Sequence, residues 1–335
     1  MKGKILITGA AGFIGSNLVD LLLQEKVPVN ELRLFVYNDE SLENLPDLPF
    51  DIVRGDIRDK QTVNRAMDGV KTVYHLAARI DFDGKTYEEY EDVNVEGTQN
   101  LLDACRGKKI QKFVFFSSIG VFGMPADTGD ILGWDETHPK TYTNFYGRSK
   151  WEGEQRVMKA HKQWGLPYVI VRPASVYGPR EKGPTLALYK AIKHHAFAMI
   201  GGGKNVMHYV YVKDLVRGVR QAQLSKKTLG NYILAGAEPT QFRDVVRYVA
   251  ESINEHVPPW HIPVPAALVL GYGLGAVGRA TGIKPPLFPS RVRTMTTSYY
   301  YSIEKAKREI HYHPETSFQQ GTRVTGAWYL EHHSL

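Results

Sequence analysis

Short apolar runs recur along the first half of the chain. Each is rich in β-branched or aromatic residues, and they fall at 4–8, 32–37, 51–53, 72–77, 111–117 and 167–172. None of them alternates with polar residues, which is typical of strands covered on both faces. Segments with helical periodicity lie between most of the runs, so strand–helix–strand units repeat. The pattern predicts an α/β fold of the Rossmann type, with a doubly wound parallel sheet over residues 1–180.

The pattern loosens after residue 180. Helix-like stretches there alternate with short, separated strand-like runs such as NYILAG at 231–236, and a proline-rich segment follows. We expect residues 181–335 to form a smaller α/β substrate lobe, with some chain crossing back to the first domain. Near the C-terminus, Ser302 is expected to cap a helix, and Ser317 and Gln320 have the spacing of a capping box.

Three glycines stand between the first apolar run and a helix-like stretch. Gly9, Gly12 and Gly15 are three residues apart in the segment ITGAAGFIGSNL. Glycines in such a place allow a tight turn and let backbone N–H groups approach a diphosphate at the positive end of a helix. A glycine triplet alone says little, but the strand before it and the helix after it predict a dinucleotide-binding loop.

Composition adds few constraints. The net charge of the 335 residues is +7, but the basic residues are spread along the chain, which favours a solvated surface over nucleic-acid binding. The single cysteine, Cys105, excludes an internal disulfide and a multi-cysteine metal site, and we expect it to be buried. The histidines lack the spacing of a metal site, so no metal is assigned. The chain starts without a leader-like segment, and we expect a cytoplasmic protein.

One stretch, from Val264 to Val277, is apolar throughout. It has about 14 residues, too few to span a bilayer. Three interpretations stay open: a buried helix of the second lobe, a helix that lines the substrate cleft, or one that dips into a membrane surface with Arg279 and Lys284 at its edge.

The glycine loop reads TGxxGxxG over residues 8–15, and this form resembles the short-chain dehydrogenase/reductase superfamily, particularly its extended branch. The resemblance implies that a Tyr-x-x-x-Lys pair carries the chemistry. About one such pair is expected by chance, and four occur: Tyr146/Lys150, Tyr189/Lys193, Tyr209/Lys213 and Tyr301/Lys305. Only the first follows a strand-like run that ends in hydroxyls, KFVFFSS, and precedes another strand. By resemblance, Ser118, Tyr146 and Lys150 are the catalytic set.

These residue types suit hydride transfer between a secondary alcohol and a nicotinamide. The alcohol must lose its proton as hydride leaves, and free tyrosine, with a pKa of about 10, is a poor base at neutral pH. A nearby ammonium and the positive nicotinamide ring would lower that pKa. We expect Tyr146 to be the base, Lys150 to assist it and to bind the cofactor ribose, and Ser118 to hold the substrate oxygen.

The resemblance also implies the other contacts to NAD or NADP. They comprise the glycine loop, the end of the second strand and residues around the later strand ends: Gly9, Gly12, Phe13, Ile14, Gly15, Tyr37, Asn38, Asp56, Ile57, Ala77, Ala78, Asn94, Lys150 and Pro173. Val36 and Tyr37 stand where an acid or base would choose between the two cofactors. Asp39 and Glu40 lie nearby, and residues 34–53 contain no Lys or Arg, so the segment favours NAD.

Two positions depart from the nucleotide-sugar enzymes of the extended branch. Ser175 in RPASVYGP and Met207 in KNVMHYVYVKD replace the usual Asn and Arg that hold a sugar-nucleotide diphosphate. Ile119 and Gly120 replace the acids that dehydratase relatives carry after the catalytic hydroxyl. Ser118, Ser175 and Met207 are therefore the expected substrate contacts. The C-terminal half resembles the 3β-hydroxysteroid dehydrogenase group.

We therefore predict an NAD(P)-dependent oxidoreductase that interconverts a secondary alcohol and a ketone on an apolar, steroid-like or 3-oxoacyl-like substrate. Two alternatives stay open: a nucleotide-sugar 4-epimerase, and a non-catalytic NAD(P)-sensing protein, which would not need a general base. The resemblance implies a homodimer formed through helices around 90–105 and 145–164. Peripheral membrane contact would run through 264–280.

Overall fold

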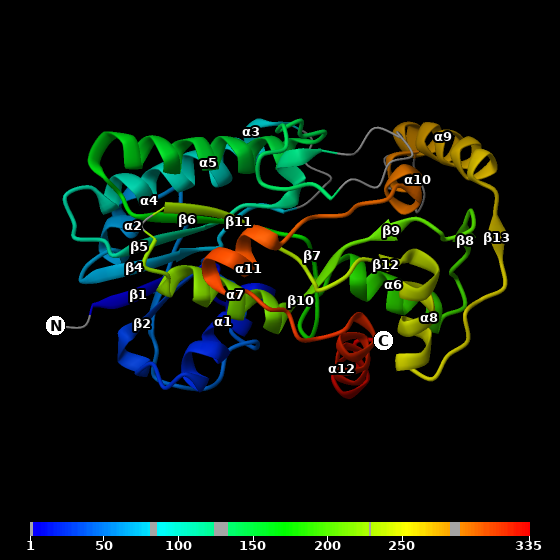
Figure 1. Cartoon of the computed structure of the whole chain (residues 1–335), viewed down its shortest axis with the longest axis horizontal. Coiled ribbons are helices and arrows are strands. Elements are labelled where there is room, and N and C mark those ends of the chain that lie inside the picture. The colour runs from blue at the N-terminus through cyan, green and yellow to red at the C-terminus, as the bar shows by residue number, and fades with distance from the viewer. Residues whose placement is uncertain (1–2, 81–85, 124–132, 228, 282–288) are drawn as a thin grey trace.

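A parallel sheet forms the centre of the protein (Figure 1). The computed structural model describes residues 3–80, 86–123, 133–227, 229–281 and 289–335. Within them, seven strands pair in the order β11-β6-β5-β4-β1-β2-β3. Their bounds are β1 (Lys4–Thr8), β2 (Leu32–Val36), β3 (Asp51–Arg54), β4 (Val70–His75), β5 (Lys112–Phe116), β6 (Tyr168–Pro173) and β11 (Leu229–Leu234). The predicted α/β architecture is confirmed, and six of these strands match the apolar runs to within two residues.

Helices cover both faces of the sheet because successive strand residues point to opposite sides. Leu6 packs with the helices of one face and Ile7 with those of the other. The first face carries α2 (Lys60–Ala66), α4 (Gly97–Cys105) and α5 (Phe145–Trp164), and the second carries α1 (Phe13–Gln24), α7 (Val212–Leu224) and α11 (Glu304–Ile310) (Figure 1). Shorter turns join them: η1 (Val29–Glu31), α3 (Glu88–Tyr90), the π-helical η2 (Glu91–Glu96) and η3 (Ile119–Phe122).

The seventh strand comes from the second half of the chain. The sequence pattern placed the NYIL run among the separated strands of the smaller lobe, but β11 pairs in parallel with β6, with Asn231 opposite Ile170. Tyr232, Ile233 and Leu234 are fully buried in the core that α1 and α7 share. Strands from both halves of the chain therefore build the central sheet.

The second lobe consists of short strand pairs and helices. Its elements are β7 (Ser175–Tyr177), α6 (Pro184–Lys193), β8 (Met199–Ile200), β9 (Val206–Met207), β10 (Tyr209–Tyr211), β12 (Thr240–Gln241), α8 (Phe242–Ser252), β13 (His261–Ile262), α9 (Val264–Thr281), α10 (Pro289–Thr296) and α12 (Phe318–Glu331). Tyr189, Phe242 and Tyr329 belong to its core.

Three local predictions can be compared with the structure. The capping box of Ser317 and Gln320 is confirmed at the start of α12. Helix α11 begins at Glu304 with Ile303 in the cap position, so Ser302 precedes the cap, although its hydroxyl still accepts a hydrogen bond from the Glu304 amide (3.4 Å). Cys105 is buried, as predicted. No described helix is both long enough and apolar enough to pass through a membrane.

Candidate active site

The glycine loop connects β1 to α1, and its three glycines are needed for different reasons. Gly9 has φ +68°, a conformation that favours glycine. A Cβ on Gly15 would overlap the carbonyl oxygen of Gly9, so glycine there lets α1 pack against the turn. A Cβ on Gly12 would have only that oxygen within 4 Å, at 3.3 Å. The side of Gly12 is therefore open to a ligand.

The first turn of α1 fits the diphosphate of a dinucleotide. Gly12 is its cap residue and supplies no capping side chain, and the turn holds no acid. Uncapped N–H groups at the start of a helix favour an anion. The hydroxyl of Thr8 accepts hydrogen bonds from the amides of Leu76 (3.2 Å) and Ala77 (3.1 Å), which fixes the chain after β4 to the end of β1. This brings Ala77 to within about 3 Å of a Cβ built on Gly9.

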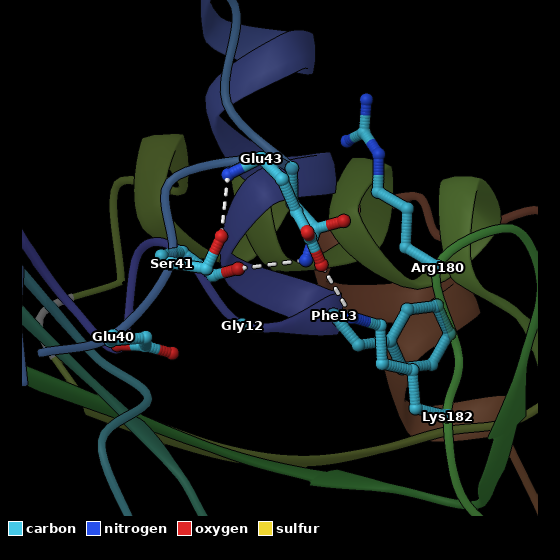
Figure 2. A pocket seen from close by; sticks show the side chains of 9 residues that line it. Gly12, Phe13, Glu40, Ser41, Glu43, Arg180 and Lys182 are labelled. Atoms are coloured by element: carbon cyan, nitrogen blue, oxygen red, sulfur yellow. Dashed lines mark hydrogen bonds and ion pairs between the residues drawn. The ribbon is translucent and has the colours of Figure 1, made fainter.

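A pocket of about 230 Å³ opens beside this loop. Figure 2 shows Glu40, Ser41 and Glu43, from the loop after β2, on one side and Arg180 and Lys182 on the other. Both cations are paired with carboxylates, Arg180 with Asp20 at 2.7 Å and Lys182 with Glu43 at 2.5 Å.

A cation at the end of β3, Arg54, reaches the loop after β2, although residues 34–53 contain no Lys or Arg. Arg54 donates hydrogen bonds to the carbonyl oxygens of Asn38 (2.7 Å) and Glu40 (3.1 Å). Its place follows from the register of the sheet, which pairs Val36 with Arg54. Tyr37 is exposed, and its amide donates to the Glu40 carboxylate at 3.2 Å.

Asp56 and Ile57 lie in the turn after β3. The Asp56 carboxylate forms an ion pair with Arg58 at 2.6 Å, and the hydrogen bonds from Arg58 hold the pKa of Asp56 below its usual value. Ile57 is buried against Gly97 of α4. The ion pair orders the loop around Asp56, and the contact of Asp56 with the cofactor stays a prediction.

Asn94 lies in the π-helical turn and is buried. It accepts a hydrogen bond from the Arg79 amide (2.7 Å) and donates to the Arg79 carbonyl (3.0 Å) and to the Ser149 hydroxyl (2.9 Å). It therefore connects the segment after β4, which carries Ala77 and Ala78, to α5.

Ser118 and Tyr146 are brought together by a close approach between two short segments. Ser118 stands two residues after β5 and accepts a hydrogen bond from the amide of Gly120, the second residue of η3. A Cβ on Gly147 of α5 would overlap the carbonyl oxygen of Gly120, so both glycines lie in the contact between η3 and α5. Asn144 caps α5 by accepting from the Gly147 amide at 2.7 Å. No carboxylate directly follows Ser118, because Ile119 and Gly120 begin η3.

Lys150 lies one turn after Tyr146 on α5 and is buried. Its Nζ is 6.0 Å from the centre of the Tyr146 ring and 5.2 Å from that of Phe115. Burial lowers the pKa of Lys150 to about 7, against an opposing effect of the Glu154 charge. The pKa of Lys150 therefore lies close to neutral pH, where its charged and neutral forms are both populated.

Burial raises the pKa of Tyr146 to about 12, although a hydrogen bond with Ser118 lowers it. We expected the neighbouring ammonium to lower this pKa. Desolvation of the buried phenol has a larger effect on its pKa than the hydrogen bond with Ser118, so the net shift of the pKa is upward. Tyr146 is consequently protonated at neutral pH.

A buried ion pair supports this part of the site, and the sequence reasoning missed it. Glu154 accepts two hydrogen bonds from Arg172 of β6, at 2.7 and 2.8 Å, and one from the Ser117 hydroxyl at 2.5 Å. Glu154 stands four residues after Lys150 on α5, and this spacing is the signal that could have identified it.

Residues of the three other Tyr-x-x-x-Lys pairs make contacts that hold the fold together. Tyr189 is buried and donates to the Thr322 carbonyl at 2.8 Å, while Lys193 pairs with Glu255. Tyr209 lies in β10, as the sequence pattern indicated. Lys305 donates to Asn231 of β11 at 2.5 Å.

Ser175 and Met207, which the sequence predicts as substrate contacts, lie near Tyr209 of the second lobe. Ser175 is exposed at the start of β7 and pairs with Tyr209 of β10, whose hydroxyl is 3.5 Å from the Met207 sulfur. Pro173, at the end of β6, is buried. Lys284 of the expected membrane edge lies outside the described residues.

Residues 5–233 match the model of the NAD dependent epimerase/dehydratase family. A 3 beta-hydroxysteroid dehydrogenase/Delta 5-->4-isomerase of Mycobacterium tuberculosis is 30% identical, covering 98% of this chain and 90% of the relative. An N-acetyl-alpha-D-glucosaminyl-diphospho-ditrans,octacis-undecaprenol 4-epimerase of Escherichia coli O157:H7 is 28% identical, covering 91% and 89%.

Solved structures agree with this relationship. The crystal structure of gox2253 has a TM-score of 0.83 and 26% identity, covering 99% of both chains. The UDP-glucose 4-epimerase of Thermus thermophilus, solved as a complex with NAD, has a TM-score of 0.76 and 26% identity, covering 98% of this chain and 99% of that one. Together with the fold and the glycine loop, these matches show that the chain belongs to the NAD-dependent epimerase/dehydratase family of the extended short-chain dehydrogenase/reductases.

Proposed function

We propose that this protein is an NAD-dependent oxidoreductase that interconverts a secondary alcohol and a ketone on an apolar, steroid-like or 3-oxoacyl-like substrate. The observation that carries the proposal is the convergence of Ser118, Tyr146 and Lys150 after β5 and on α5. Ser118 follows β5 as the glycine loop follows β1, and in parallel sheets the carboxyl ends of the strands share one edge, where ligands bind.

The chain's own residues would have distinct tasks. When bound, oxidised nicotinamide accepts the hydride and brings a positive charge close to the phenol. Tyr146 takes the hydroxyl proton of the alcohol, and Ser118 orients the substrate oxygen. Lys150 donates hydrogen bonds to the cofactor ribose and, in its charged form, favours the phenolate. Glu154 favours that charged form, because its own charge raises the pKa of Lys150.

The choice of an apolar substrate rests on Ser175 and Met207. Neither side chain offers the charge or amide that a nucleotide diphosphate would need in the second lobe. The names of the two curated relatives describe a 3β-hydroxysteroid and a sugar carried on diphospho-undecaprenol, and both molecules contain large apolar parts. The relatives therefore support a lipid-like substrate more than a free nucleotide sugar.

The choice of NAD over NADP rests on the pocket beside the glycine loop. Glu40 and Glu43 line it, and Arg180 and Lys182 are already paired with carboxylates. Arg54 is engaged by two carbonyl oxygens. A 2′-phosphate would meet two carboxylates and would have to compete for each of these cations. We also propose a homodimer through α4 and α5, by analogy with the family.

A nucleotide-sugar 4-epimerase is the second candidate, because one curated relative and several structural neighbours are 4-epimerases. An epimerase would oxidise and reduce the same carbon without net cofactor reduction. A non-catalytic NAD(P) sensor is less well supported, since a sensor has no need for the Ser118, Tyr146 and Lys150 arrangement.

The test measures cofactor reduction by absorbance with a 3β-hydroxysteroid, and epimer formation with UDP-glucose. We expect steroid-dependent reduction of NAD. Tyr146→Phe should lower turnover by about 100-fold or more while cofactor affinity stays within a few-fold. Tyr142→Phe, an exposed tyrosine just before α5, is the matched control and should retain activity. Substantial activity of Tyr146→Phe would refute the catalytic assignment, and conversion of UDP-glucose alone would favour the epimerase.

A further inference from the structure

Helix α9 has one packed side and one exposed apolar side. Ala267 is fully buried with Val292 of α10 and Ile200 of β8, so these residues attach the helix to the second lobe. Away from this contact the helix exposes Val269, Leu270, Tyr272 and Leu274, which are 37–72% exposed. The helix lies at the outer edge of the molecule, away from the central sheet (Figure 1).

The exposed residues are neighbours along the helix surface, because Val269 and Tyr272 are three residues apart and Leu270 and Leu274 are four. Trp260, directly before β13, is 65% exposed, and between it and Arg279 the sequence holds no Asp, Glu, Lys or Arg. Single exposed apolar residues are common, but a contiguous apolar patch marks an interaction site. We call Val269, Leu270, Tyr272 and Leu274 the α9 patch.

The charge of the surrounding sequence points to the partner. From residue 256 to residue 303 the chain contains four Arg or Lys and no Asp or Glu, whereas the average acid content would place about five acids there. One of the four, Arg293 of α10, is exposed among the described residues. An apolar patch that includes Tyr272, in a segment that also carries the exposed Trp260 and is only basic, suits the surface of a membrane with anionic lipids.

We propose that the α9 patch docks on a membrane surface that contains anionic phospholipid. A second copy of the chain fits less well: in a two-fold dimer through this patch, two basic segments would face each other without acids of their own to pair. Insertion of the helix side into the interface is sufficient, since the apolar stretch is too short to span the bilayer. The proposal does not depend on which alcohol the active site accepts.

Vesicle flotation with the full chain tests this proposal. Vesicles are made of phosphatidylcholine with or without phosphatidylglycerol, and the variant is Val269→Glu with Leu270→Glu. We expect the wild type to float with the anionic vesicles and the double variant to bind about tenfold less, because two carboxylates enter the apolar interface. Leu224→Glu, at the exposed end of α7, is the matched control and should bind like the wild type.

A second variant tests the contribution of charge to membrane binding. Arg293→Glu should weaken binding to the anionic vesicles but not to phosphatidylcholine alone, because only the former depends on attraction to basic residues. The proposal is overturned if the wild type binds neither vesicle, or if the double variant binds as well as the wild type. It is also overturned if the double variant changes only the oligomeric state in gel filtration, which would assign the patch to a second copy.

Discussion

Lys150 is expected to destabilise the protein while serving its chemistry, and the size of the effect follows from its pKa. Burial lowers this pKa from an ordinary 10.5 to about 7. The unfolded chain therefore binds more protons at Lys150 than the folded protein between pH 7 and pH 10.5. One pKa unit corresponds to about 1.4 kcal/mol. Burial of Lys150 therefore lowers the free energy of unfolding by about 4 kcal/mol at pH 7 and by about 2 kcal/mol at pH 9. The destabilisation by Lys150 thus becomes smaller as the pH rises, and the free energy of unfolding increases.

Lys150→Met keeps the length of the side chain and removes the charge. We expect the variant to lose activity and to be more stable than the wild type, with the difference in the free energy of unfolding shrinking by about 2 kcal/mol between pH 7 and pH 9. Urea unfolding, followed by circular dichroism without cofactor, measures this difference at each pH. Lys159→Met, at an exposed position of the same helix, is the control, and its stability should stay parallel to that of the wild type.

Parallel pH profiles for the wild type and Lys150→Met would refute the reasoning. Such a result would mean that water or a rearranged side chain solvates the ammonium in the folded protein. The other titrating groups are common to both proteins and largely cancel in the comparison. Two of them interact with the Lys150 charge: His75, whose pKa burial lowers to about 3, and Glu154, four residues further along α5. His75 is neutral in both proteins across this pH range.

Three further groups of substitutions have defined outcomes. Gly12→Val should weaken cofactor binding, measured by calorimetry, with little change in urea unfolding, whereas Gly15→Ala should destabilise the fold because its Cβ would overlap the carbonyl of Gly9. Glu154→Gln should lower the free energy of unfolding by about 3–5 kcal/mol, since it leaves Arg172 buried without its partner charge; a loss below about 1 kcal/mol would show that the pair is solvated. Glu40→Gln should raise the kcat/KM for NADP relative to NAD because it removes a carboxylate from the pocket, and an unchanged ratio would place the 2′ position elsewhere.

The sequence predicted most of the central sheet because the inner strands are buried on both faces and therefore read as unbroken apolar runs. β11 has the same pattern in NYIL, but its partner β6 lies about 60 residues earlier, and no local signal indicates that pairing. The approach of Arg54 to the loop after β2 depends on the pairing of β2 with β3 for the same reason.

The candidate site divides in a similar way. The glycine loop and the Tyr146–Lys150 spacing are local patterns, so the sequence identified them as candidates. The pKa values of these two side chains depend on how deeply the fold buries them, which a pattern does not contain. The pair of Glu154 and Arg172 joins a helix to a strand and likewise requires the tertiary structure.

The position of β11 affects how the protein is made. All the proposed catalytic residues and the glycine loop leave the ribosome long before residue 229, yet β6 remains an open sheet edge until β11 is synthesised. During that interval the buried carboxylate of Glu136 also lacks the Ile233 amide that donates to it at 2.8 Å. Open strand edges pair with other chains and promote aggregation. The nascent chain therefore has to extend beyond α7 to β11 before its nucleotide-binding half can close.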